Sequence, residues 1–223
     1  MSRKLITAAL LFSTVAAAHQ STILEQIRYS MYQFAGISRG IPVKAHMDNV
    51  APEDAVQLNR VYPLSGEEGQ FTGVRFTPSG TFGVQSVDFT APNSSAFGVT
   101  CTVSDDRIVN LYVITGDAPD NNALPDVSVV VPGQPGNPDA AVLFSVLLDK
   151  PLWIQSGESV FVAIDHPGDY PSVGCLTTAA VGPDDKEEEF WSFATSAPND
   201  WTGYEDIGIY EKPLVSVSGI RVF

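Results

Sequence analysis

Alternation of apolar and polar residues is the most regular pattern along this chain of 223 residues. In Phe97–Val103, "FGVTCTV", every odd-numbered position is apolar and every even-numbered position is glycine or threonine. A period of two predicts a half-buried antiparallel strand, with Cys101 on the side that faces the core. Similar short β-rich runs, separated by Gly, Pro, Asn and Asp, are Gly73–Phe76, Phe82–Phe89, Ile108–Ile114 and Val127–Val131.

Two continuous apolar runs lie close together around the stretch "FSVLLDKPLWIQSGESVFVAID". The runs Val142–Leu148 and Val160–Ile164 are too short for membrane-spanning helices and are bounded by turn residues. They therefore predict strands buried on both faces, or on one face with a hydrophobic rim on the other. Ser156-Gly157-Glu158 predicts the chain reversal between Leu152–Ile154 and the second run.

The C-terminal stretch "LVSVSGIRVF" changes the phase of its alternation. Val215 and Val217 fall in one phase, and Ile220 and Val222 fall in the other. Gly219 stands at the change, and a glycine at a phase change predicts a β-bulge.

Together these runs predict an all-β fold. About ten short strands at spacings near a dozen residues are typical of an antiparallel two-sheet β-sandwich, here jelly-roll-like, over residues 65–223. No alternation of strands and helices and no internal repeat are visible in the sequence.

One helix is expected before the sandwich, at Ser21–Ala35. Its apolar positions fall near one face, Ser21 or Thr22 can cap it, and Gly36 can end it. The helix either covers one end of the β core or serves as an arm that binds a partner. The prolines of Ile41–Leu64 predict an irregular connection, so residues 19–64 form a helix followed by that connection.

The first 18 residues have the pattern of a secretory signal peptide. A basic pair at Arg3-Lys4 precedes the apolar run Leu5–Val15, and Ala16–Ala18 supply a cleavage site of small residues. The alternative is a retained N-terminal anchor. With cleavage, we expect a secreted or cell-surface protein that has no membrane span.

Charge and cysteine content agree with export. The chain carries 12 basic against 26 acidic residues, a net charge of −14. Such a charge repels phosphates, so nucleic acid and anionic lipid are not expected as partners. In an oxidising compartment Cys101 and Cys175, the two cysteines, predict one disulfide. Two free buried thiols are the alternative.

The sequence has no secure catalytic signature. Gly36–Gly40, "GISRG", matches G-x-S-x-G around Ser38, but Pro42 follows it where a nucleophile elbow requires a helix. We interpret it as a helix end and a flexible connection. Ser159, Asp165 and His166 do not suggest a triad, because adjacent strand residues point to opposite faces, and His166 is expected in a solvated turn. No catalytic residue and no certain cofactor is therefore expected.

An acidic loop, "GDAPDNNALPD", is a candidate metal site. It concentrates oxygen ligands of the kind that Ca²⁺ prefers, at Asp117, Asp120, Asn121, Asn122 and Asp126. It lacks the ligand order of an EF-hand. Asp and Asn also build turns by hydrogen bonding to their own backbone, and that reading is the simpler one.

Aromatic residues near the C-terminus are a candidate carbohydrate surface. Aromatic faces stack on sugar rings, and flanking amides and carboxylates bond hydroxyl groups; the residues concerned are Trp191, Trp201, Tyr204, Asn199 and Asp200. The alternative is that the tryptophans pack the last hairpin onto the core. Asn93-Ser94-Ser95 is a glycosylation sequon only in a eukaryotic host.

The order of these segments resembles the C-terminal β-sandwich modules of exported bacterial proteins. The resemblance covers about Phe71–Phe223 and rests on "LLDKPLWIQSGESVFVAID", "HPGDYPSVGC", "FWSFATSAPNDWTGYED" and "SVSGIRVF". Phe161 stands where those modules carry a tryptophan-like position, and the N-terminal helix is an addition. The resemblance implies a structural, adhesive or ligand-binding role.

From the sequence we expect an exported, non-enzymatic β-sandwich with a structural, surface or adhesive role, whose partner is a protein or glycan at a cell surface. The first alternative is a carbohydrate-binding module that depends on Ca²⁺, and the second is a secreted hydrolase. Whether the chain forms an oligomer is left open by the sequence.

Overall fold

The computed structural model describes residues 42–48, 60–62, 70–96, 99–136, 140–168, 171–180, 190–193, 200–204, 206 and 211–222. These residues belong to one compact unit, Pro42–Val222. Within them the chain is all-β, and no α-helix occurs. The expected signal peptide, the expected helix Ser21–Ala35 and Ser38 lie outside the described residues.

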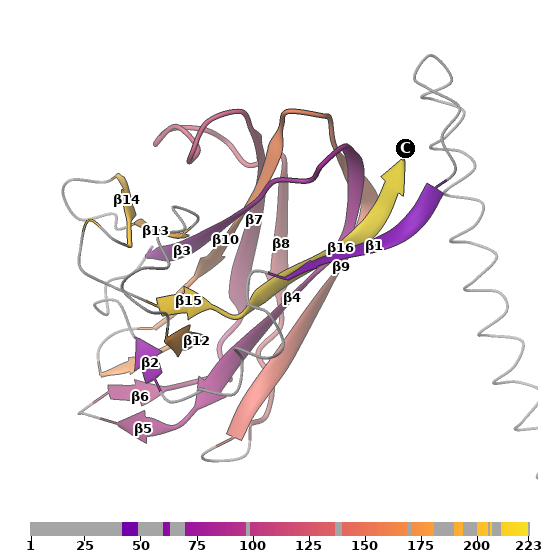
Figure 1. Ribbon diagram of the computed structural model, residues 1–223. Coiled ribbons are helices and arrows are strands. Elements are labelled where there is room, and N and C mark those ends of the chain that lie inside the picture. The colour runs from indigo at the N-terminus through magenta and orange to yellow at the C-terminus, as the bar shows by residue number, and fades with distance from the viewer. Residues whose placement is uncertain are drawn as a thin grey trace, which may run out of the picture. The chain divides into compact units, whose positions relative to one another are not determined.

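Two larger antiparallel sheets contain most of the strands (Figure 1). The four-stranded sheet has the order β1 (Pro42–Asp48), β16 (Val215–Val222), β4 (Thr81–Asn93), β9 (Ala140–Ile154). The six-stranded sheet has the order β14 (Trp201–Gly203), β13 (Phe190–Phe193), β3 (Phe71–Phe76), β10 (Ser159–Asp165), β7 (Arg107–Ile114), β8 (Val127–Val131). The all-β, antiparallel prediction is confirmed.

Two small three-stranded sheets complete the described strands. One has the order β11 (Ser172–Val173), β6 (Val99–Cys101), β5 (Ser95–Ala96), and its β11–β6 pair is parallel. The other has the order β15 (Glu211–Pro213), β12 (Leu176–Ala180), β2 (Arg60–Tyr62).

The expectation of an irregular connection is wrong at β1 and β2. β1 pairs along its length with β16, from Pro42 opposite Val222 to Asp48 opposite Ser216. Pro42 is tolerated because it is the first residue of an edge strand, where a missing N–H breaks no central ladder. The pairing joins segments from opposite ends of the chain, which local patterns do not predict.

One main hydrophobic core contains buried side chains from both larger sheets. Val160, Val162 and Ile164 of β10 lie in it, while Phe161 and Ala163 belong to a separate cluster on the opposite face of the six-stranded sheet. β10 lies between β3 and β7, and its first six residues are all buried. The prediction of a strand buried on both faces is confirmed here.

β9 follows the other predicted alternative. Phe144, Val146 and Leu148 face the main core, whereas Leu143 is 62% and Leu147 is 67% exposed. β9 differs from β10 because, among the described residues, a hydrophobic cluster packs against only one of its faces, whereas β10 has a cluster on each face.

The β-bulge predicted at Gly219 is confirmed. The register between β16 and β4 shifts between Ser218 and Gly219. A Cβ atom at Gly219 would lie 2.0 Å from the backbone oxygen of Gly83, so only glycine allows this close approach of the two strands.

Candidate functional site

A disulfide joins β6 to the segment that follows β11. Cys101 and Cys175 are bonded, with their Cα atoms 5.3 Å apart and a separation of 74 positions in sequence. Both are buried and pack with Val173. The predicted disulfide is confirmed, and so is the inward orientation of Cys101.

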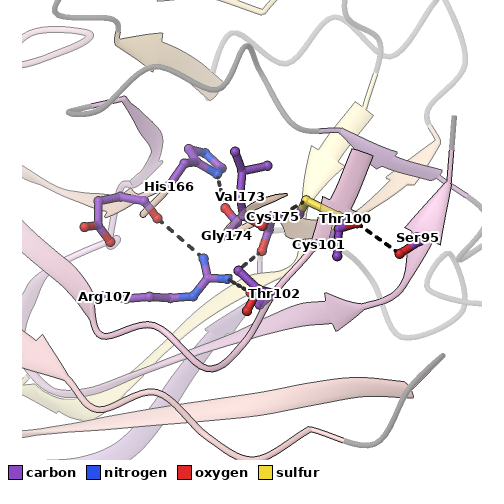
Figure 2. Close-up of a disulfide and its surroundings, with 10 residues drawn as sticks. Ser95, Thr100, Cys101, Thr102, Arg107, His166, Val173, Gly174 and Cys175 are labelled. Atoms are coloured by element: carbon purple, nitrogen blue, oxygen red, sulfur yellow. Dashed lines mark hydrogen bonds between the residues drawn. A yellow bond between two sulfur atoms is a disulfide. The ribbon is translucent and has the colours of Figure 1, made fainter. Parts of the chain in front are cut away.

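A buried arginine holds the loops on either side of this disulfide (Figure 2). Arg107 is fully buried, and its Nη2 donates to the carbonyl oxygens of Thr102 and Cys175, at 3.1 Å each. The guanidinium also lies over the rings of Phe144 and Phe89, 5.6 Å and 6.0 Å from their centroids. Burial lowers the pKa of Arg107 to about 10, so the group stays charged at neutral pH.

His166 is buried beside this arginine and takes part in a chain of hydrogen bonds. Its Nδ1 donates to the Gly174 carbonyl oxygen at 2.6 Å, and its Nε2 lies 2.8 Å from the Thr72 hydroxyl oxygen. The Thr72 hydroxyl also forms a hydrogen bond with the Tyr204 hydroxyl at 3.0 Å. The expectation of a solvated turn histidine is wrong, because the backbone at His166 pairs with Gln70 and draws the ring inward.

A neutral imidazole has one N–H, so a neutral His166 carries its proton on Nδ1, facing the Gly174 carbonyl oxygen, and accepts from Thr72 at Nε2. Burial lowers the pKa of His166 to about 4, and the nearby Arg107 charge acts in the same direction. Solvent does not reach these hydrogen bonds, because the exposed fractions of His166, Thr72 and Tyr204 are only 4%, 1% and 6%. Such an arrangement fixes the loop of Gly174 to β3.

Asp165 and Ser159 do not join His166 in a relay. The Asp165 carboxylate accepts from the backbone N–H of Ile108 at 2.7 Å, and burial raises its pKa to about 6. The Ser159 hydroxyl bonds the Thr77 hydroxyl at 2.8 Å. Both side chains therefore have hydrogen-bond partners other than His166.

The outer face of the six-stranded sheet carries a second apolar cluster, which we name the outer aromatic cluster: Phe71, Tyr112, Phe161 and Trp201. Phe161 is at its centre. Its ring meets Trp201 edge-to-face at a centroid distance of 4.8 Å and Tyr112 at 6.3 Å. Gly73 on β3 lies directly beneath, where a Cβ atom would be 2.1 Å from Phe161 Cζ.

Of the proposed carbohydrate-binding residues, the structure describes the side chains of Asp200, Trp201 and Tyr204, and Trp201 and Tyr204 lie in different environments. Trp201 is half-buried in the outer aromatic cluster, whereas Tyr204 is buried in the main core. Asp200 is exposed beside Trp201. The backbone of Trp191 pairs with Gly73 and Gly203; its side chain and the whole of Asn199 lie outside the described residues.

The proposed metal ligands are spread along an exposed loop. Asp117 forms an ion pair with Arg75, and the Asp126 carboxylate accepts from the Val113 N–H at 2.7 Å. The Asp120 carbonyl oxygen accepts from the Ala123 N–H, which closes a turn. Asn121 and Asn122 are exposed. Among the described residues, no three His, Cys, Asp or Glu side chains are grouped to hold a metal ion.

The sequence left open which apolar residues of β9 are exposed. Leu143 and Leu147 share the outer face of the four-stranded sheet with Ser145 between them. In "VLFSVL" both the odd-numbered and the even-numbered positions include apolar residues, so the alternation does not reveal which set faces solvent.

Comparisons with known proteins do not add to this description. No protein-family model matches the chain, and a search of curated proteins finds no match. Within the described residues, no helix is long and apolar enough to cross a bilayer.

Proposed function

We propose that this chain is an exported, non-enzymatic protein, built on a jelly-roll-like β-sandwich, with a structural, surface or adhesive role. The sandwich is supported by the main core, to which β4 and β9 of one sheet and β3, β7 and β10 of the other contribute buried side chains. Export is supported by the Cys101–Cys175 disulfide and by the leader-like pattern of the first 18 residues.

A single observation carries the adhesive role. Leu143 and Leu147 are exposed on the same face of β9, in a stretch from Ala140 to Leu148 that has no charged residue, although the chain as a whole has a net charge of −14. Exposed apolar groups that cluster on a soluble domain are typical of an interaction surface.

The non-enzymatic part rests on how the polar groups are used. Arg107 and His166 hydrogen bond to backbone groups of neighbouring loops, Asp165 bonds the backbone of β7, and Ser159 bonds to Thr77. These contacts stabilise the loops that flank the disulfide.

Adhesion of coated beads tests the proposal. Beads that carry the mature chain should adhere to cells or to one another, and Leu143→Lys/Leu147→Lys should abolish adhesion while leaving the melting temperature unchanged. Adhesion that the double variant retains would contradict this surface as the cause. Ester, peptide or glycoside hydrolysis that tracks with the purified chain would contradict the non-enzymatic role.

Carbohydrate binding is the second candidate, and the position of Trp201 favours it. Trp201 is half-buried, held edge-on by Phe161, and next to the exposed Asp200. An aromatic ring held in this way can stack on the apolar face of a sugar, and an adjacent carboxylate can accept from its hydroxyl groups.

A glycan array with two tryptophan variants tests this candidate. Trp201→Ala should abolish glycan binding, whereas Trp153→Ala, which removes a half-buried tryptophan from the other larger sheet, should retain it. Repeating both arms with CaCl₂ and with EDTA measures the calcium dependence. Equal binding by both variants would exclude Trp201 as the sugar platform.

A further inference from the structure

β9 ends the four-stranded sheet with one edge that no other described strand pairs. From Ala140 to Leu147 it pairs residue for residue with β4, and beyond Leu147 the register shifts. We name Ala140–Leu147, "AAVLFSVL", the β9 edge. An edge strand presents backbone N–H and C=O groups that can pair with another strand.

The β9 edge lacks the features that normally protect sheet edges. Natural edge strands carry charged residues, prolines or bulges that discourage pairing with another chain. The β9 edge has no charged residue and no proline; Asp149, Lys150 and Pro151 come only after the register shift. An edge of this kind favours addition of a strand.

The sequence of the edge is self-complementary about Ser145. In an antiparallel pairing that places Ser145 opposite Ser145 of a second copy, Leu143 lies opposite Leu147 of that copy, and Leu147 opposite its Leu143. Phe144 lies opposite Val146 on the other face. Each exposed leucine thus meets an exposed leucine, and each core-facing residue meets another core-facing residue.

From this register we propose that the β9 edge binds a second copy of this chain through antiparallel pairing of Leu143–Leu147 across a two-fold axis at Ser145. The two four-stranded sheets then form one continuous sheet with the same face outward in both copies. This inference rests on the proposed adhesive role, because it names the partner of the same surface.

Charge at the contact is compatible with this pairing. Asp88 on β4 is opposite Ser145 and is the acidic residue in the ladder nearest to the axis. Its counterpart in the second copy lies three strand spacings away, about 14 Å, which exceeds the Debye length of about 8 Å at 0.15 M salt. Salt screens the repulsion between two acidic chains and leaves the leucine contact, so added salt should strengthen the dimer.

The five paired residues per copy form a small contact, which fits a weak, concentration-dependent dimer. Sedimentation equilibrium of the mature chain should show a monomer–dimer equilibrium that tightens between about 0.02 and 0.5 M NaCl. Leu147→Lys should raise the dissociation constant by about tenfold or more, since a lysine would face leucine. Val130→Lys, at a residue 62% exposed on β8 of the other larger sheet, should leave it unchanged.

A cysteine at the axis tests the register itself. Residues directly opposite each other have Cα atoms about 4.5–5.5 Å apart, within reach of a disulfide. Ser145→Cys should therefore form a covalent dimer under mild oxidation, and the native cysteines do not compete because they are bonded to each other. Leu143→Cys should not, because two copies of residue 143 would be about 13 Å apart.

Two outcomes overturn the inference: a chain that remains monomeric at every concentration and salt, or cross-linking of Leu143→Cys as readily as Ser145→Cys. If beads still adhere while the chain is monomeric, the proposed function stands and self-pairing fails. If the chain dimerises but beads do not adhere, self-pairing stands and the adhesive role fails. Binding of a different protein or a glycan at the β9 edge of a monomeric chain would also refute self-pairing.

Discussion

Replacing Gly73 by alanine should measure how tightly the outer aromatic cluster packs on β3. A Cβ atom at Gly73 would lie 2.1 Å from Phe161 Cζ and 2.4 Å from its Cε1, and 2.9 Å from Trp201 Cζ3. Carbon atoms in contact are normally about 3.5–4.0 Å apart, so the Phe161 ring would have to retreat by more than about 1 Å.

The retreat is costly because Phe161 is fully buried. Tyr112 and Trp201 lie against its ring, and Gly73 closes it from below, so movement disturbs the whole cluster. Overpacking of this kind costs about 1–3 kcal/mol. For a domain of this size each kcal/mol lowers the melting temperature by about 2–4 °C, so Gly73→Ala should melt about 2–12 °C below the parent.

A matched glycine and a double-mutant cycle identify the cause. At Gly80 a Cβ atom would meet nothing closer than the Val222 carbonyl oxygen at 3.9 Å, so Gly80→Ala should melt like the parent or slightly above it. Phe161→Leu replaces the ring by a smaller side chain, so in the double variant it should recover most of the stability that Gly73→Ala loses. Thermal unfolding followed by circular dichroism provides each value.

Two results would refute this reasoning. One is a Gly73→Ala variant that melts with the Gly80→Ala control. The other is a Phe161→Leu change that lowers stability equally in the parent and in the Gly73→Ala background, since additive losses mean that the two groups do not clash.

Three further predictions concern the core, the disulfide and the pH dependence of stability. Val162→Asp buries an unpaired charge in the main core and should give no cooperative unfolding transition; a cooperative transition near the parent's would contradict the burial. As a control, Glu158→Ala removes an acceptor 2.8 Å from the Gln155 backbone nitrogen and should lower the free energy of unfolding in urea by about 0.5–1.5 kcal/mol. Replacing both bonded cysteines by serine should lower the free energy of unfolding by about 4 kcal/mol, because the bond closes a loop of 74 residues; a loss under about 1 kcal/mol would refute the estimate. Burial raises the pKa of Asp165 to about 6, so this group makes the free energy of unfolding fall as pH rises from about 4 to 6. Burial lowers the pKa of His166 to about 4, so this group makes the free energy of unfolding rise between about pH 4 and 6.5. The two effects offset each other in the parent, whereas the free energy of unfolding of Asp165→Asn should rise by about 3 kcal/mol across this pH range; an Asp165→Asn profile as flat as the parent's would be the contrary result.

The local elements of this protein were predictable because each depends on neighbours in sequence. The period of two in "FGVTCTV" placed Cys101 inward, and the glycine at the phase change placed the bulge at Gly219, as the structure confirms. Two cysteines behind a leader-like segment predicted the disulfide. The strand pattern and the bulge depend on backbone constraints that act within a few residues. The disulfide was predictable because two cysteines allow one pairing within the chain.

The environments of the site residues depended on segments far apart in the chain. His166 looked like a turn residue, but Thr72 and Gly174 supply the partners that allow a neutral imidazole to be buried. The interior position of Arg107 likewise requires carbonyl groups that the disulfide loop brings to it. Charged and polar residues have low burial propensities, so only the assembled partners can offset their desolvation.

The apolar runs in β9 and β10 are similar in sequence but differ in burial, and this difference also depends on segments far apart in the chain. The run in β10 lies between two strands, with the main core on one face and the outer aromatic cluster on the other. Only one face of the run in β9 packs in a hydrophobic cluster of the described residues, so Leu143 and Leu147 remain exposed. The short length of both runs and the turn residues around them predicted strands, because these are local features of the sequence. Which faces are buried was decided by the packing of segments far apart in the chain against each face, which local patterns do not reveal.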